Sequence, residues 1–186
     1  MAEAIRQDQQ RQALIDRLGV IRRRSVAHQG ELTAEQLLRV PSFGGWSVGV
    51  VFEHLCVAED SYHTPIDRVI AKAAPDARAA TAMWQPSIMG NLLVRSFRSP
   101  RKMTAPGIYQ PALQPRNDVV GEYLKRVGKS LELLDRAGSL FWQKIKLSSP
   151  VTRIIRLNLG DAFEVIVTHA ERHLGQVERI REAMGK

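Results

Sequence analysis

Apolar residues recur at helical spacing in four long segments of this chain. A repeat every three or four positions places apolar side chains on one face of a helix, and such a face must be buried against a neighbour. We therefore predict an all-α protein folded as a four-helix bundle. The predicted helices are residues 2–27, a segment that follows Ser47, a segment from about Asn117 to a stop at Gly138, and about 160–184.

Local signals set some of the helix ends. Ser47 follows a Gly-Gly turn and is a good N-cap for the second long helix. Thr33 and Gln36 have the spacing of a capping box, which predicts a short helix that stops before Pro41. In the first long helix, Leu14 and Leu18 mark the face that we expect to be buried.

Pro65 is expected to disturb the second long helix near Thr64. Proline has no amide hydrogen and disfavours helical geometry in the residue before it. Two outcomes remain open from the sequence: the helix kinks there, or a new helix starts with Pro65 in its first turn.

Six of the nine prolines lie between Pro75 and Arg116. This stretch is predicted to be a long irregular crossover, with a short helix around Ile88 to Phe97. So long a connection need not join antiparallel neighbours, and it allows the second and third long helices to run parallel. Further along, a loop through Ser148 and two following residues leads into VTRIIRLNL, which we predict to be a short extended stretch.

The composition is that of an ordinary globular chain. With 186 residues, 44% of them hydrophobic, it is long enough for one domain with its own core, so we expect a single domain over 1–186. The polar start MAEAIRQDQQRQ resembles neither a secretion signal nor an anchor, and no apolar run approaches the length of a membrane span. The single cysteine, Cys56, cannot form an internal disulfide, which favours a cytoplasmic location.

Histidines give the chain its candidate chemistry. His169 and His173 lie four residues apart in HAERH, so on a helix both imidazoles stand on one face, where they could bind the same metal ion. They fill a gap in the apolar stripe of the last helix, whereas Glu164, Glu171 and Arg172 fall on the side predicted to face solvent. A metal would satisfy one nitrogen of each buried ring, although a single buried histidine is more often a hydrogen-bonded core residue.

His54 provides a third imidazole on a face predicted to be buried. It lies about two turns into the second long helix, where a bundle would bring it towards the other two histidines. Cys56 lies about 200° around the helix from His54, so it is a poor ligand or nucleophile, and we expect a buried structural thiol.

Two segments together, WSVGVVFEHL and LGDAFEVIVTHAERHLGQVERI, resemble the DinB-like (YfiT-like) superfamily of bacterial four-helix bundles. The resemblance extends over most of the chain, because the proline-rich crossover lies between the two motifs. It implies an up-down-down-up bundle that binds a divalent metal through His54, His169 and His173. Dimers are common in that family, so the resemblance also suggests a homodimer. The sequence itself carries no signal for one.

The resemblance also implies a class of chemistry. Three neutral imidazoles leave a metal its full charge and an open position, as in catalytic zinc sites. Imidazole suits zinc, nickel, copper and iron, of which we expect zinc or nickel. Relatives activate a low-molecular-weight thiol for S-transfer or isomerisation, and others are described as metal-dependent hydrolases. We therefore expect a small-molecule substrate, with thiol chemistry first, hydrolysis second and non-catalytic metal binding third.

Three residues near the histidines are further candidates for a role at the site. HAERH is not the HExxH motif of zinc proteases, because Glu171 lies about 200° from His169 and should not act as the base. Gln176, three residues past His173, shares the inward side and could hydrogen-bond a ligand or substrate, or simply lie at the edge of the bundle. For Trp46 we favour anchoring of the second helix over lining the site.

The formal net charge of +8 raises binding to nucleic acid or another polyanion as a second class of function. Basic residues cluster at Arg22 to Arg24 and around Arg95 to Lys102. No known nucleic-acid-binding motif accompanies them, and aromatic residues are only 6% of the chain, so we expect no specific nucleic-acid partner and no membrane partner. The positive charge could equally attract an acidic thiol or carboxylate substrate.

Overall fold

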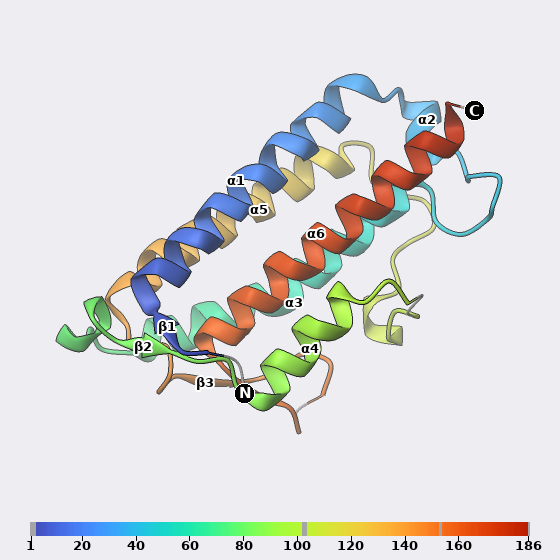
Figure 1. Cartoon of the computed structure of the whole chain (residues 1–186). Coiled ribbons are helices and arrows are strands. Elements are labelled where there is room, and N and C mark those ends of the chain that lie inside the picture. The colour runs from blue at the N-terminus through green and yellow to red at the C-terminus, as the bar shows by residue number, and fades with distance from the viewer. Residues whose placement is uncertain (1–2, 102–103, 153, 186) are drawn as a thin grey trace.

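Four long helices lie alongside one another in the computed structural model, which describes residues 3–101, 104–152 and 154–185 (Figure 1). Each long helix packs against two others, in the cyclic order α1, α5, α3, α6. Their apolar faces meet inside this ring, which confirms the prediction of a mostly helical protein. The long helices are α1 (Gln7–Glu31), α3 (Val48–Lys72), α5 (Val119–Arg136) and α6 (Leu159–Met184).

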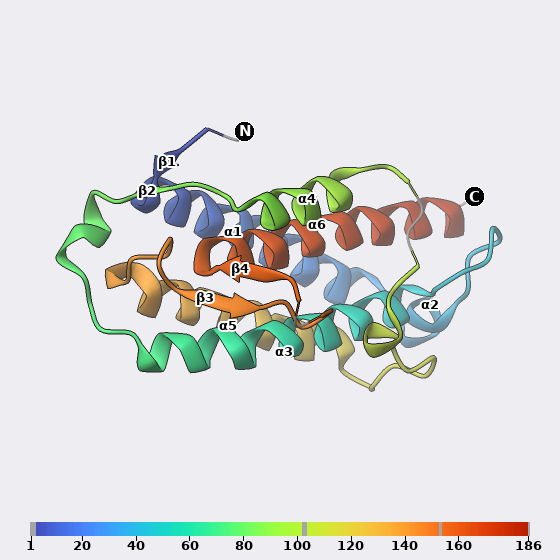
Figure 2. The ribbon, with the colours of Figure 1, turned by 90° about the horizontal axis from the view of Figure 1, so that it is seen from below.

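Shorter elements cover the outside of the ring. Figure 2 shows the β3–β4 hairpin across one side of the bundle, with α4 alongside α6. Both strand pairs are antiparallel, β1 with β2 and β3 with β4. These elements are β1 (Ile5–Arg6), α2 (Ala34–Leu38), β2 (Met83–Trp84), α4 (Ile88–Arg98), β3 (Lys146–Ser148) and β4 (Arg156–Asn158), with 3₁₀ turns at Ala77–Ala80, Gly107–Tyr109 and Ala137–Ser139.

The predicted helix caps are confirmed. The Ser47 hydroxyl accepts a hydrogen bond from the Val50 amide at 3.3 Å. Thr33 and Gln36 form the reciprocal capping box at the start of α2. Before Ser47, Gly44 and Gly45 have φ angles of 75° and 97°, a conformation that favours glycine and turns the chain into α3.

The first long helix differs from its prediction at both ends. Residue 2 lies outside the described residues, and β1 precedes α1, which begins at Gln7 and continues to Glu31 instead of ending near residue 27. Pairing with β2 takes the backbone out of helical geometry before Gln7, whose amide donates to the Ala82 carbonyl at 2.8 Å. The expected buried face is confirmed, since Leu14 and Leu18 are fully buried.

The helix α3 runs without a break through Pro65, which excludes one of the two outcomes that the sequence left open, a new helix starting at this position. The missing proline N–H removes one intrahelical hydrogen bond. Tyr62, Ile66 and Ile70 on the same half of the helix are buried in the core, and this packing outweighs the local preference.

The crossover and the segment before α6 agree in part with the sequence. The short helix predicted around Ile88 to Phe97 is confirmed as α4, and the extended stretch is confirmed over β4. Ser148, expected in a loop, instead ends β3, because this segment pairs with β4. Three residues of alternating burial are too few for a sequence pattern to reveal such a strand.

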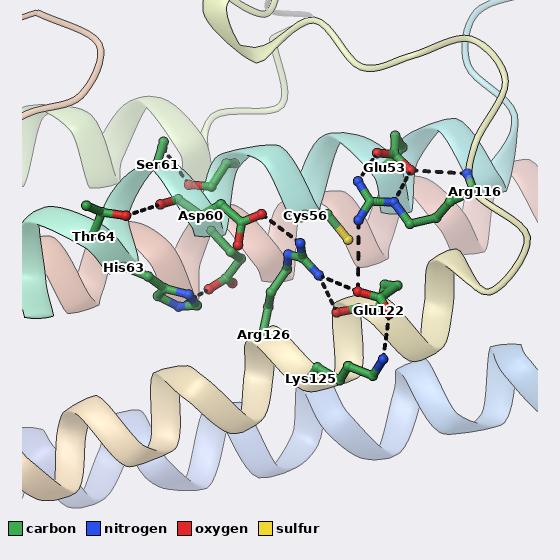
Figure 3. A network of polar contacts seen from close by, with 12 residues as sticks. Glu53, Cys56, Asp60, Ser61, His63, Thr64, Arg116, Glu122, Lys125 and Arg126 are labelled. Carbon is green, nitrogen blue, oxygen red and sulfur yellow. Dashed lines mark hydrogen bonds and ion pairs between the residues drawn. The ribbon is translucent and has the colours of Figure 1, made fainter.

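Charged side chains connect α3 with α5 and with the segment that precedes α5 (Figure 3). Arg116 pairs with Glu53, and Arg126 contacts Asp60 at 2.7 Å. Between these pairs, Cys56 is fully buried, and burial raises the pKa of its thiol to about 12. The expected structural thiol is therefore confirmed. In the described part of the chain, no helix combines the length and the apolar character of a membrane span.

The start of α6 depends on a glycine. A Cβ on Gly160 would overlap the indole nitrogen of Trp84, which is 4% exposed and donates to Asn158 Oδ1 at 2.9 Å. We expect Gly160→Ala to lower the free energy of unfolding by about 1 to 3 kcal/mol, because a packed indole must move. Urea unfolding followed by circular dichroism measures this difference.

Gly128→Ala is the matched control for that substitution. Gly128 lies within α5, and a Cβ there meets nothing within 4 Å. Alanine should stabilise this exposed helical position by up to about 1 kcal/mol. Equal effects of the two substitutions would contradict a special role for Gly160.

Candidate metal centre

The three histidines converge between two helices. His54 comes from α3, and His169 and His173 come from α6, which packs against α3. Their ring centroids are 4.5 to 5.0 Å apart. One nitrogen from each ring can be chosen so that all three lie within 4.8 Å of one another, so the cluster could hold a metal ion.

Hydrogen bonds from the outer nitrogens orient two of the rings. His54 Nδ1 donates to the Tyr109 carbonyl at 2.8 Å, and His173 Nδ1 donates to Gln176 Oε1 at 2.9 Å. Each donation leaves Nε2 as the unprotonated nitrogen, and His54 Nε2 lies 3.2 Å from His169 Nε2. This is the arrangement of metal-binding histidines, in which the second ring nitrogen is hydrogen-bonded to a carbonyl or carboxylate.

Burial keeps the rings neutral. Desolvation is the main cause that lowers the pKa of all three, and the neighbouring imidazoles lower those of His169 and His173 further. The pKa of His173 falls to about 3, and that of His169 falls well below its usual range. Protons therefore do not compete with a metal for these nitrogens near neutral pH.

A cavity of about 770 Å³ opens onto the three rings. Its volume is in the range of small-molecule binding sites. Trp46 lines it, with its ring centroid 4.9 Å from that of His54 and 6.4 Å from that of His173. The sequence favours an anchoring role for Trp46, and in the structure its ring both packs against the core and lines the cavity beside the histidines.

The side of α6 expected to face solvent is partly buried. Glu164 is only 7% exposed and binds Arg17 of α1 and Arg98 of α4, at 2.8 and 3.0 Å, so the sequence prediction was wrong for this residue. The apolar stripe of α6 gives no sign of this burial, because α4 packs on that side of α6. Glu171 pairs with Arg17 at 2.7 Å and is directed to α1, in agreement with its exclusion as a base.

The crossover supplies site residues that the sequence could not identify. Phe97 of α4 stacks edge-on against His169, with centroids 5.1 Å apart, and Tyr109 orients His54 through its backbone carbonyl. Arg172 holds the chain after α4 against α6 by donating to the carbonyls of Phe97, Ser99 and Arg101. A carbonyl carries no sequence signal, so only the path of the crossover reveals such contacts.

Glu59 is a buried acid at the edge of the cavity. It is 2% exposed, and its Oε2 accepts from Ser130 at 2.9 Å and lies 3.0 Å from His63 Nε2. No described residue hydrogen-bonds its Oε1. No sequence signal points to Glu59, because it is not part of a recognisable motif.

Comparisons with known proteins agree with this architecture. No curated protein and no solved structure matches the chain. A protein-family model of the DinB superfamily matches residues 17–177. This match includes His54, the whole crossover and the HAERH segment of α6. The chain therefore belongs to the DinB superfamily.

Proposed function

We propose that the protein is a divalent-metal-dependent enzyme that activates a low-molecular-weight thiol for S-transfer, with water as the alternative nucleophile in a hydrolase. The observation that carries this proposal is the set of three neutral imidazoles facing a cavity of about 770 Å³. His54, His169 and His173 would hold the ion, for which zinc and nickel are our candidates. When bound, such an ion supplies a positive charge that lowers the pKa of a neighbouring thiol or water.

The chain's own residues support this role. Tyr109 and Gln176 fix the orientation of two ligand rings, so little reorganisation would accompany metal binding. Phe97 and Trp46 shield the rings with apolar surface, which strengthens electrostatic interactions inside the cavity. Since Glu171 forms an ion pair with Arg17, we do not assign it the role of catalytic base.

We also propose an up-down-down-up topology and a cytoplasmic location, as the family resemblance implies. The chain direction of each long helix, which the reader can follow by colour in Figure 1, supports an up-down-down-up arrangement in which α3 and α5 are parallel. The buried, unpaired Cys56 supports a reducing cytosol. Arg24 and Arg98 are paired with Glu178 and Glu164, which weakens both basic clusters as a nucleic-acid surface.

Cobalt substitution tests thiol activation without knowledge of the second substrate. We expect the cobalt-loaded protein to develop a thiolate-to-cobalt charge-transfer band when titrated with 2-mercaptoethanol, because a thiolate would occupy the open position. The His173→Ala variant should show no band. A cobalt-loaded wild type without any band would contradict thiol activation, and metal-dependent hydrolysis of 4-nitrophenyl acetate would then favour the water alternative.

A further inference from the structure

The cavity beside the histidines has an excess of positive charge. Among its described lining residues, Arg172 and Arg179 are the cations and Glu59 is the only carboxylate. One oxygen of Glu59 is engaged by Ser130 and His63 within the bundle. The three histidines are neutral, so they would not offset the charge of a bound divalent ion. An anionic ligand is therefore electrostatically favoured in this cavity.

The two arginines differ in their contacts. Arg172 donates to three backbone carbonyls after α4, so its guanidinium has a structural role. Arg179 forms no hydrogen bond or ion pair with any residue in the described ranges, in contrast to Arg181 two positions later, which binds Glu31 and His28. Arg179 is thus the lining cation whose donors are available to a ligand.

Gly175 leaves space for the Arg179 guanidinium to lie back along α6. One terminal nitrogen of Arg179 lies 3.6 Å from the position that a Cβ of residue 175 would occupy. The guanidinium therefore lies one turn back along α6, and the Arg179 side chain forms part of the cavity wall. The backbones of residues 173 and 179 are separated by roughly 9 Å along the helix. Burial of the ring is the main cause that lowers the pKa of His173, and at this separation the Arg179 charge is one of the minor causes.

The rest of the cavity wall is mainly apolar. Trp46, Phe97, Tyr62 and Leu93 contribute side chains to its wall. An aliphatic or aromatic segment of a ligand would bury apolar surface here, which favours its binding. The lining thus fits a molecule that combines an apolar body with a group for the metal and a group for the free arginine.

We propose that the cavity binds an organic carboxylate whose apolar body separates the acid from a metal-binding thiol or hydroxyl, and that Arg179 holds the carboxylate. This inference rests on the proposed function, because it assigns the second end of the ligand to the metal. Arg179 acts here as a specificity residue: it selects an anionic ligand over a neutral one of the same length.

A pair of matched probes tests the inference: 6-mercaptohexanoate and 6-mercaptohexanol differ only in the acid group. Calorimetric titration of the zinc-loaded protein should give about fivefold tighter binding of the acid, the scale expected for a partly exposed charge-assisted contact. Arg179→Ala should remove this preference while leaving the affinity for the alcohol unchanged. Arg179→Lys should retain part of it, because the charge remains.

Arg22→Ala is the matched control, since it removes one exposed arginine of α1 that lies outside this cavity. It should leave the preference intact. Equal loss in both variants, or a preference retained in Arg179→Ala, would overturn the role of Arg179. If the wild type binds both thiols equally, the inference fails and the proposed function stands; if it binds neither, both fail.

Discussion

Replacing His173 by alanine is expected to lower the affinity of the protein for zinc by at least about 100-fold. Loss of a residue that only supports a metal ligand costs up to about this factor, and loss of a ligand should cost more. Competition with a chromogenic zinc chelator gives the affinity, and elemental analysis gives the stoichiometry. We expect one metal ion per chain in the wild type, and similar losses in His54→Ala and His169→Ala.

His63→Gln is the control for that experiment. His63 lies on α3, like His54, but its Nε2 contacts Ser130 and Glu59 inside the bundle. The variant should keep wild-type metal affinity, provided that circular dichroism shows it to be folded. A wild type that holds no stoichiometric metal after exposure to zinc or nickel would refute the metal centre.

The metal-free protein is expected to lose about 3 kcal/mol of its free energy of unfolding through His173 alone between pH 7 and pH 4. Burial is the main cause that lowers the pKa of this imidazole from 6.5 to about 3 in the folded chain. Below about pH 6.5 the unfolded chain takes up a proton that the folded chain does not. Stability that is present above this pH is therefore lost as the pH falls.

Urea unfolding after chelator treatment, at several pH values, measures this loss. His173→Gln is the comparison, because it removes the titrating group and keeps the carboxylates that both proteins share. The variant should lose about 3 kcal/mol less than the wild type over the same pH range. Parallel pH profiles for the two proteins would show that His173 is not held neutral by the fold.

The residues predicted correctly from sequence are those whose environment follows from spacing along one helix. Leu14 and Leu18 repeat at four residues and are buried, and Ser47 caps α3 as its position after the Gly-Gly turn predicts. His169 and His173 share one side of α6 for the same geometric reason. Convergence with His54 depended on how two helices pack, which no local pattern determines.

The errors share one cause, which is contact between distant segments. Glu164 looked solvent-exposed on an isolated helix, yet Arg17 and Arg98 reach it from two other helices. Pro65 was expected to disturb the second long helix, yet packing in the bundle core keeps α3 continuous through it. The carbonyl of Tyr109 could not be anticipated, because its placement is a property of the path of the crossover.

The Tyr109 carbonyl couples two properties of the site, the shape of the cavity and the basicity of the His54 ligand. The crossover forms much of the cavity wall, and it also provides the acceptor for the outer nitrogen of His54. A mutation that reshapes the crossover for a new substrate would therefore also alter how basic the His54 imidazole is as a donor to a cation. Divergence of substrate preference and of metal selectivity should consequently proceed together in descendants of this chain.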